Sequence, residues 1–391
     1  MPLFLQGLFW FGLLTVCYTY FGYGILLYLI VSVKRLWKRP ENLTFLYEPN
    51  ITLMVAAYNE EAYIRDKIEN SLGLNYPRGN IQFLFVTDGS NDRTPEIVRQ
   101  FPEIKLMHQP DRQGKIMAVE RAMPEVTGEI VVFTDANTLL NREALRNIVR
   151  HFADKKVGVV SGEKRILNRE ADEAAGAGEG FYWKYESKLK QWDDELYSVM
   201  GAAGELFAIR TALFEPIPKD SLIEDFYMSF KIVEKGYKIA YEPEAYAMEE
   251  PSASVKEELK RKIRIAAGGI QSIVRLSELL NPFSYGVITF QYVSHRVLRW
   301  TLAPLALPLV FLANLLLWNQ GVFYQYVFVG QVMFYLAALL GLMLEKKQVR
   351  LKVLFIPYYF CMMNYAVYAG FKRYLKGSQS VLWEKAARRT H

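Results

Sequence analysis

Two oxygen-bearing side chains follow an apolar run at a spacing suited to binding a cation. Residues 130–133 are apolar, and Asp135-Ala136-Asn137 comes shortly after them. On a tight turn, side chains at i and i+2 can face one ion, and Mg²⁺ or Mn²⁺ favours carboxylate, carbonyl and phosphate oxygens. Asp135 and Asn137 are therefore candidate metal ligands. An ordinary Asp/Asn turn, or a cap for a helix beginning near Asn141, is the alternative.

A second polar turn and a lysine suggest a nucleotide site. Asp88-Gly89-Ser90 follows the apolar run 81–86. In a nucleotide site, Asp88 would accept a hydrogen bond from the uracil N3–H or a ribose hydroxyl; otherwise it only shapes a turn. Lys115 follows Gly114 at an expected helix start, where a phosphate can bind. A solvated helix lysine is the plain alternative for Lys115.

Glu224 and Asp225 are the candidates for acid–base chemistry. They are framed by the apolar residues 222–223 and Phe226. Burial raises the pKa of a carboxyl group, which suits it to act as a general base. Asp225 would also suit the N-cap of a helix over 226–235, and the two roles are compatible.

Upstream, the small-residue turn 201–205 would let the backbone approach a ligand closely.

These residues lie at the ends of predicted strands. Strands are predicted at 51–57, 81–86, 104–107 and 129–133, and helices at 60–72, 94–100 and 114–122. This βαβα order predicts an α/β fold with a doubly wound, mostly parallel sheet. Ligands bind at the carboxyl ends of the strands in such sheets. Here those ends carry Tyr58-Asn59-Glu60-Glu61, Asp88 and Asp135, so a cation or hydrogen-bond donor is needed to offset their repulsion.

Two helices with basic and apolar residues are predicted on either side of Asp225. One covers about 254–280 and contains Arg261-Lys262-Ile263-Arg264, and the other covers 181–196. Each gathers apolar residues near one face. Each is therefore either a helix lying in a membrane interface or an ordinary surface helix.

Three stretches, 1–33, 300–344 and 353–371, contain no Asp, Glu, Lys or Arg. A transmembrane helix needs about 20 apolar residues, so the first predicts an uncleaved anchor; a cleaved signal peptide would have a shorter apolar core. The second is long enough for two spans joined by a turn at 318–321. The third is aromatic-rich and precedes a basic tail, which favours a re-entrant or interfacial segment over a simple span.

Basic residues flank each apolar stretch, as expected for cytoplasmic ends. They are Lys34, Arg35, Lys38 and Arg39; Arg296 and Arg299; Lys346, Lys347, Arg350 and Lys352; and Lys372, Arg373, Lys376, Lys385, Arg388 and Arg389.

The composition of the 391 residues excludes some classes of protein. The net charge of +6 is explained by these basic flanks beside anionic lipid. No nucleic-acid-binding module is recognisable, so no nucleic acid is expected as a partner. The two cysteines, Cys17 and Cys361, lie in apolar segments without metal-site or redox spacing, and they imply no disulfide framework.

The order of these motifs resembles the family 2 membrane glycosyltransferases, which include bacterial cellulose, hyaluronan and poly-N-acetylglucosamine synthases and related exopolysaccharide transferases. The resemblance covers about residues 50–300 and implies a GT-A-type doubly wound mixed sheet. It implies nucleotide contacts and metal binding for Ala57, Tyr58, Glu60, Asp88, Lys115, Asp135 and Asn137. Glu224-Asp225 is similar to the Thr-Glu-Asp motif, so Asp225 inherits the role of base, and Gly204, Glu205 and Arg261 are expected near the acceptor.

The sequence departs from the family pattern in three places. Asn137 replaces the second Asp of Asp-x-Asp, which leaves the metal site one carboxylate fewer. Ile223 replaces the Thr of Thr-Glu-Asp. Residues 261–265 stand where the family has Gln-(Gln/Arg)-x-Arg-Trp; Arg264 is retained for diphosphate, whereas Arg261 replaces Gln and Ile265 replaces Trp. The family's Trp stacks on the acceptor sugar, so processivity is open, and the alternative platforms are Trp183, Trp192, Trp300 and Trp383.

The resemblance implies an inverting hexosyltransferase of the plasma (inner) membrane that uses a UDP-sugar and Mg²⁺ or Mn²⁺. Its acceptor would be a growing glycan, yielding a β-linked extracellular polysaccharide, or a lipid-linked molecule that receives one sugar. A nucleotidyltransferase and a transporter with a soluble appendage are more distant alternatives. The sequence identifies no secretion or regulatory subunit.

The expected organisation has five parts, with the catalytic domain cytoplasmic. They are an anchor (1–40), the GT-A domain (41–250), interfacial helices (251–299), two transmembrane helices (300–345), and a re-entrant or interfacial segment with a basic tail (346–391).

Overall fold

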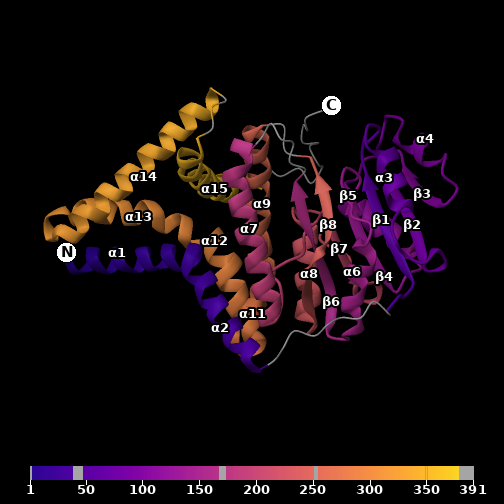
Figure 1. Cartoon of the computed structure of the whole chain (residues 1–391), viewed down its shortest axis with the longest axis horizontal. Helices are drawn as coiled ribbons and strands as arrows, with labels where there is room; N and C mark the ends of the chain where they lie inside the picture. The colour runs from indigo at the N-terminus through magenta and orange to yellow at the C-terminus, as the bar shows by residue number, and fades with distance from the viewer. Residues whose placement is uncertain are drawn as a thin grey trace.

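The computed structural model describes residues 2–37, 47–166, 173–250, 254–347, 349 and 351–377. An α/β body lies at one end of the molecule and a helical arm at the other (Figure 1). The helices α7 and α9 stand between the arm and the sheet. Several residues named above lie outside the described part of the chain: Lys38, Arg39, Arg350, Trp383, Lys385, Arg388 and Arg389.

The body is built on one eight-stranded sheet with the order β3-β2-β1-β4-β7-β6-β8-β5. Strands β3, β2, β1 and β4 run parallel, whereas β7 is antiparallel to both β4 and β6. Strand β8 is parallel to β6 and antiparallel to β5. The mixed GT-A-like sheet is therefore confirmed. The strands are β1 (Ile51–Ala57), β2 (Ile81–Asp88), β3 (Ile104–Gln109), β4 (Ile130–Asp135), β5 (Leu139–Leu140), β6 (Val157–Ile166), β7 (Leu206–Arg210) and β8 (Lys238–Glu249).

The register of the parallel strands gathers the polar turns at one edge. Ala56 of β1 lies opposite Val86 of β2 and Asp135 of β4. All three strands thus end at the same level, and the turns that follow them lie together. The central strands are rich in apolar residues because both faces of the sheet are buried: Leu53 and Val55 face one core, and Met54 faces the other.

Helices cover both faces of this sheet. They are α3 (Ile64–Leu72), α4 (Thr94–Val98), α5 (Lys115–Ala122), α6 (Ala144–Val149), α7 (Glu173–Leu196), α8 (Glu224–Glu234) and α9 (Val255–Arg275). The predicted helix 254–280 thus ends earlier, at Arg275, and a 3₁₀ turn (Ser277–Leu280) follows it. The helix predicted over 181–196 begins earlier, at Glu173.

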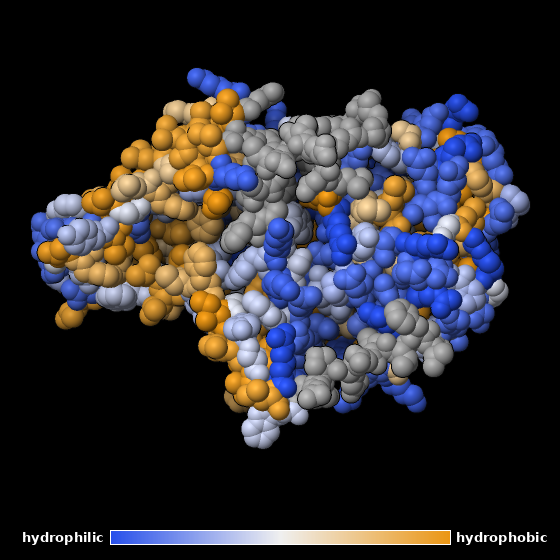
Figure 2. Space-filling model, in the orientation of Figure 1, coloured by the Kyte–Doolittle hydropathy of each residue, from blue (hydrophilic) through white to orange (hydrophobic). Residues whose placement is uncertain are grey.

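The arm consists of the N-terminal helices and the helices after residue 281. They are α1 (Pro2–Cys17), a π-helical turn (Tyr18–Gly22), α2 (Tyr23–Trp37), α10 (Pro282–Tyr285), α11 (Val287–Tyr292), a second π-helical turn (Val293–Val297), α12 (Leu298–Trp300), α13 (Leu302–Leu316), α14 (Val322–Lys346) and α15 (Lys352–Leu375). Figure 2 shows hydrophobic residues over the surface of the arm and hydrophilic residues over the body.

Two helices within the described residues are long and apolar enough to cross a membrane, Pro2–Trp37 and Val322–Lys346. Together with the hydrophobic surface of the arm, these two helices indicate membrane association. The segment between them is bent: the helical stretch 287–300 meets α13 at 54°, with the break at Thr301. Since α13 alone has only 15 residues, a membrane crossing by α13 would need the preceding helix as well.

The C-terminal helix α15 is continuous through Pro357 and packs against α9 and α14. Gly370 allows this close packing, because a Cβ at this position would lie 2.8 Å from the backbone nitrogen of Ala267 in α9. The re-entrant or interfacial placement of this segment stays a prediction.

Buried ion pairs join the arm to the body. Glu186 of α7 binds Arg296 at 3.0 Å and Arg299 at 2.8 Å. The sequence predicted that these two arginines flank a membrane segment. In the structure they form ion pairs with the buried carboxylate of Glu186. His295 is fully buried between Glu186 and Asp193, at 3.1 and 2.5 Å. Removing Glu186 would take one carboxylate from Arg296, Arg299 and His295 together, which is costly at buried positions.

Candidate active site

Asp135 and Asn137 lie at the carboxyl end of β4 and face the same side. Both are partly exposed, whereas Ala136 and Thr138 between and after them are buried. One carboxylate and one amide oxygen form a hard donor set that fits Mg²⁺ or Mn²⁺ when phosphate oxygens complete the shell. Within the described residues, no three His, Cys, Asp or Glu side chains cluster as a metal site. Protein carboxylates alone therefore do not build a complete cation cage here.

Lys115, at the first position of α5, bridges two candidate residues. Its Nζ lies 2.8 Å from Oδ1 of Asp135 and 3.0 Å from Oε1 of Glu224. Burial works against its charge, but the carboxylates of Asp135 and Glu224 outweigh burial and raise the pKa of Lys115. The solvated-helix alternative for Lys115 is therefore wrong: this lysine is buried against two candidate site residues.

A second lysine, which was not selected from the sequence, lies behind residues 134–138, the candidate metal-binding turn (the metal turn below). The fully buried Lys67 of α3 donates to Oγ1 of Thr134 at 2.9 Å and to the carbonyl of Thr138 at 2.8 Å. It thereby ties together the two ends of the turn that carries Asp135. Burial lowers the pKa of Lys67 to about 7, against the opposing charge of Asp135. Its spacing was a usable signal, since Lys67 falls on the buried stripe of α3 with Ile64 and Ile68.

Asp88, at the end of β2, holds the loop that leads to Lys115. Its Oδ2 accepts from the backbone amides of Gln113 at 2.8 Å and Gly114 at 2.6 Å. Arg121 donates to its Oδ1 at 3.3 Å. Asp88 therefore has a positioning role in this structure, and its expected nucleotide contact would come in addition to these bonds.

The turn after β1 is held in a special conformation. Asn59 has a φ of 54°, and its side chain exchanges hydrogen bonds with Asn91 at 2.7 and 2.9 Å. The backbone amide of Glu60 donates to Thr94 at 2.9 Å. The guanidinium of Arg112 lies 3.7 Å from the ring centre of Tyr58. Arg112 was not selected from the sequence, and it places a cation on a residue expected to hold the nucleotide.

Glu224 and Asp225 form the first turn of α8. The N-cap is Ile223, so the expectation that Asp225 caps this helix is wrong. Burial, and then the neighbouring charge of Glu224, raises the pKa of Asp225 to about 7. For Glu224, burial is outweighed by Lys115, which lowers the pKa of that carboxyl group. The pair is thus split into a charged partner of Lys115 and a weaker acid able to exchange a proton near neutral pH.

Two glycines bring the 201–205 turn against this helix start. Gly201 has a φ of 102°, and a Cβ there would lie 2.5 Å from the ring of Phe226. A Cβ on Gly204 would lie 2.9 Å from Oδ2 of Asp225. The turn therefore packs directly over the catalytic candidate, as its small residues suggested.

Glu205 and Arg261 lie together in a charged cluster beside this turn. Glu205 binds Lys164 at 2.8 Å and Arg261 at 3.5 Å, and Lys164 also pairs with Glu249. Although burial raises it, the charges of Lys164 and Arg261 lower the pKa of Glu205. Lys164, on β6, was not anticipated. The structure thus brings Gly204, Glu205 and Arg261 to one side of Asp225.

Arg264 reaches the start of α8 from α9. Its Nη1 donates to the carbonyl of Leu222 at 3.2 Å. Gly268, one turn further along α9, makes this possible because a Cβ there would lie 2.9 Å from the side chain of Leu222. The charge of Arg264 also helps to lower the pKa of Glu224.

The described tryptophans differ in their distance from the catalytic helix. Trp192 packs on Tyr28 of the arm, and Trp183 lies by Lys262, whose Nζ is 5.1 Å from its ring centre. Trp300 packs against Phe226 of α8, with ring centres 5.4 Å apart, and against Gly269 of α9. Trp300 is thus the tryptophan that lies beside the residue following Asp225.

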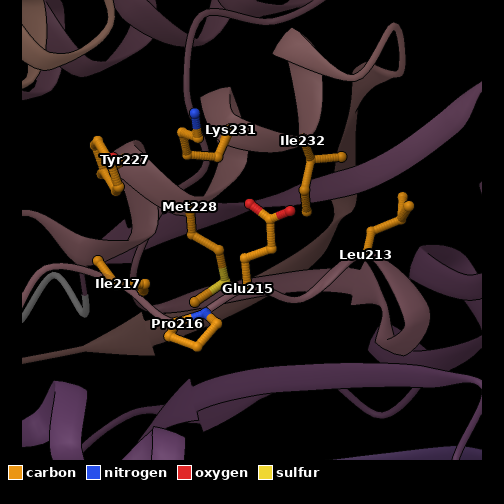
Figure 3. Close-up of a pocket in the computed structure, with 8 residues that line it drawn as sticks. All are labelled: Leu213, Glu215, Pro216, Ile217, Tyr227, Met228, Lys231 and Ile232. Carbon is orange, nitrogen blue, oxygen red and sulfur yellow. The ribbon is translucent and has the colours of Figure 1, made fainter.

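Figure 3 shows a small pocket lined by residues of α8 and of the segment 213–217. It contains none of the candidate residues named above, although Glu215 and Lys231 contribute charge. Its lining residues are Leu213, Glu215, Pro216, Ile217, Tyr227, Met228, Lys231 and Ile232.

Residues 49–268 match the family described as "Glycosyltransferase like family 2". The chain belongs to glycosyltransferase family 2. The matched segment contains the whole sheet, the metal turn, Glu224-Asp225 and Arg264. This is the family that the order of the motifs resembled.

Three similar proteins illustrate the range of the family. A probable glycosyltransferase YdaM of Bacillus subtilis is 27% identical over 56% of this chain and 55% of its own length. The beta-monoglucosyldiacylglycerol synthase of Trichormus variabilis is 30% identical over 40% of this chain and 34% of its own length. The poly-beta-1,6-N-acetyl-D-glucosamine synthase of Staphylococcus aureus is 27% identical over 58% of this chain and 56% of its own length. The chain thus spans about half the length, or less, of these curated relatives.

A solved structure shares the fold over nearly the whole chain. The mannosyltransferase PcManGT from Pyrobaculum calidifontis, solved with GDP-Man and Mn²⁺, has a TM-score of 0.72 and 24% identity. The match covers 95% of this chain and 100% of the other. The likeness therefore includes the helical arm as well as the sheet.

Proposed function

We propose that this glycosyltransferase transfers a sugar from a UDP-sugar to a carbohydrate acceptor with inversion, and that it builds a β-linked extracellular polysaccharide at the membrane. The observation that carries the proposal is the position of Asp225. Its carboxyl group has a pKa raised to about 7 and lies against the Gly204 turn. The adjacent Glu224 is linked through Lys115 to Asp135 at the strand end. An acid–base group therefore stands next to a site for a charged donor.

On the donor side, Ala57, Tyr58, Glu60 and Asp88 surround the nucleoside at the ends of β1 and β2. Asp135 and Asn137 hold Mg²⁺ or Mn²⁺, consistent with the Mn²⁺ and nucleotide sugar in the solved mannosyltransferase. When bound, this cation neutralises charge on the diphosphate. Lys115 and Arg264 supply further positive charge to the leaving diphosphate, where negative charge develops in the transition state.

On the acceptor side, Asp225 accepts the proton of an attacking hydroxyl. The hydroxyl oxygen forms a bond to C1 while the bond from C1 to the diphosphate oxygen breaks, and the electron pair leaves with the nucleoside diphosphate. Attack from the opposite face inverts C1, so an α-linked donor gives a β-linked product. Gly204 leaves room for the acceptor over Asp225, and Glu205 and Arg261 offer hydrogen bonds beside it.

Polymer synthesis is favoured by the likeness to the poly-N-acetylglucosamine synthase and by the place of Trp300. Trp300 packs on Phe226, so an aromatic ring lies near Asp225 even though position 265 is Ile. It comes from a different element than the Trp of the family motif. Trp300 is the proposed stacking platform for the acceptor sugar.

The arm is proposed to hold the enzyme in the plasma membrane as a multi-pass protein, with its catalytic domain cytoplasmic. The apolar helices Pro2–Trp37 and Val322–Lys346 support the membrane assignment. Lys34 and Arg35 support the orientation because positive charge marks the cytoplasmic end. In the structure both residues bind the end of α7, through the carbonyl of Glu195 at 2.7 Å and its carboxylate at 2.7 Å.

The second candidate function is a single transfer to a lipid-linked acceptor. It is favoured by the likeness to a glucosyldiacylglycerol synthase and by Ile265 in place of the motif's Trp. Both candidates share the same donor site, so only the product separates them. A nucleotidyltransferase would instead consume a sugar phosphate and release pyrophosphate.

The test uses purified full-length protein in lipid nanodiscs with a panel of UDP-sugars, GDP-mannose, and Mn²⁺, Mg²⁺ or chelator. We expect metal-dependent UDP release with one UDP-sugar and a ladder of glycan products by mass spectrometry. A single added sugar would refute the polymer synthase and favour the lipid-linked acceptor. Pyrophosphate release, or turnover with GDP-mannose alone, would refute the proposed donor chemistry.

A further inference from the structure

The ammonium group of Lys115 occupies the centre of the donor site. It contacts Oδ1 of Asp135 at 2.8 Å and Oε1 of Glu224 at 3.0 Å, and so joins the metal turn to the acid–base pair. Only 13% of the Lys115 side chain, 15% of Asp135 and 10% of Glu224 are exposed. Partial burial of this kind strengthens charge-assisted hydrogen bonds and weakens screening by salt.

The fold, rather than a flexible side chain alone, sets this position. Lys115 begins α5 directly after Gly114, which has a φ of 97°. Asp88 fixes the preceding loop by accepting from the amides of Gln113 and Gly114 at 2.8 and 2.6 Å. The backbone that carries the lysine is thus anchored to the end of β2.

This placement sets the ammonium against any divalent cation on the same carboxylate. Asp135 is the one carboxylate of the metal turn, since its partner in that turn is the neutral Asn137. An ion bound through Oδ1 of Asp135 would stand next to a positive charge. The two positive charges repel each other, so both bind Asp135 more readily when negative charge arrives with the metal, or when the lysine moves away.

We propose that Lys115 is the resident cation of the donor-free site, which excludes free metal until the metal arrives together with the nucleotide diphosphate. In the empty enzyme, Lys115 pairs with both Asp135 and Glu224 and offsets part of their negative charge. On donor binding, its ammonium turns to the diphosphate and releases Oδ1 of Asp135 to the metal. Metal and nucleotide therefore bind with strong positive coupling, and Lys115 is its source. This inference rests on the proposed function, because it assumes a metal-dependent sugar-nucleotide donor.

The test measures Mn²⁺ binding by electron paramagnetic resonance, with and without UDP, and needs no turnover. Wild type is expected to bind Mn²⁺ weakly alone and at least about tenfold more tightly with UDP, a coupling of about 1.4 kcal/mol. In Lys115→Met, Mn²⁺ alone should bind about tenfold more tightly than in wild type, while UDP binds more weakly. Lys115→Arg keeps the charge and should resemble wild type for Mn²⁺ alone.

A matched control removes the same charge elsewhere. Lys231 lies on α8, pairs with Glu234 and lines the separate pocket of Figure 3. Lys231→Met should leave Mn²⁺ binding unchanged. If Lys231→Met raised the affinity for Mn²⁺ as much as Lys115→Met does, the effect would come from net charge alone, and the inference would be overturned.

The remaining outcomes are also decisive. If Lys115→Met binds Mn²⁺ alone as weakly as wild type, or loses Mn²⁺ and UDP binding together, Lys115 does not compete with the metal. If wild type shows no coupling between Mn²⁺ and UDP, the inference fails without recourse to any variant. A wild type that binds no Mn²⁺ even with UDP overturns the proposed donor site itself; the other results leave that site standing.

Discussion

Replacing Asp225 by Asn should make the enzyme both inactive and more stable at neutral pH. The folded-state pKa of Asp225 is about 7, compared with an ordinary value of 3.8. Folding therefore favours the protonated form, and ionisation costs stability. The difference corresponds to about 4 kcal/mol at ~1.36 kcal/mol per pH unit, which is an upper bound because the side chain is partly exposed.

The sign of the effect gives a specific pH window. Below about pH 4 the carboxyl group is protonated in both states, so wild type and Asp225→Asn should have similar stability. As the pH rises from about 4 to about 7, the unfolded chain loses this proton first, and wild type loses stability relative to the variant. Above about pH 7 the difference should be constant. The neutral Asn never carries the buried charge.

The assay is thermal unfolding of both proteins in one detergent, without metal or nucleotide, at pH 5 to 8. The unfolding midpoint of Asp225→Asn should exceed that of wild type by several degrees at pH 8, and by less at pH 5. Asp220→Asn is the control, because Asp220 is 65% exposed and pairs with Arg275 at the surface. If the difference in unfolding midpoint between Asp225→Asn and wild type were negative, or the same at every pH, burial would not disfavour the ionised form of this carboxyl group as argued.

The same variant should lose catalysis. Removing a general base typically costs about 10²–10⁴-fold in rate, measured here as UDP release at saturating donor. If Asp225 is the base, as proposed, wild-type kcat/KM should fall about tenfold per pH unit below about pH 7, since only the ionised carboxylate can accept a proton. Wild-type turnover by Asp225→Asn with intact UDP binding would exclude Asp225 as the base.

Three further changes test the surroundings of the site. Gly204→Val places side-chain carbon on the carboxylate of Asp225 and should lower kcat about tenfold to a hundredfold. Calorimetry would check that the variant still binds UDP. An unchanged kcat would show that the close contact between residue 204 and Asp225 is not needed for turnover. Lys67→Met leaves the buried carbonyl and hydroxyl of the metal turn without their donor and should cost about 1–3 kcal/mol of unfolding free energy; equal or higher stability in denaturant titrations would contradict this. Glu186→Ala removes the carboxylate shared by two partly buried arginines and a buried histidine, and should lower the unfolding free energy by about 3–5 kcal/mol. Glu278→Ala, at an exposed position, should change the unfolding midpoint little.

The sheet could be predicted from the sequence because its signals are local. Short apolar runs bounded by polar turns identify strands, and a run buried on both faces needs no long-range information to be recognised. The chain order then places the ends of β1, β2 and β4 at one edge, which the register of Ala56 with Asp135 confirms. The antiparallel β7 was not anticipated, because no strand was predicted at residues 206–210 and a βαβα order does not set the direction of a later strand.

The helical arm shows the limit of composition alone. The charge-free stretches predicted membrane helices, and Pro2–Trp37 and Val322–Lys346 have the required length and apolarity. The 54° bend at Thr301 was not predicted, because a smooth apolar run contains no signal for where packing will break a helix. Arg296 and Arg299 matched the pattern of basic residues that flank a membrane helix. Only the fold showed that Glu186 binds both of them.

Residue type and position identify, before any fold is known, the residues that can do chemistry: carboxylates and amides after strands, a lysine at a helix start, and Glu224-Asp225 in an apolar frame. These follow from residue type and from spacing within one element. The tertiary structure decided how the residues act on one another. It set Lys115 between Asp135 and Glu224, 20 and 109 positions away, and it pressed Gly204 onto Asp225. Charge and burial act through space, so the pKa of Asp225 is a property of the assembled site rather than of its motif.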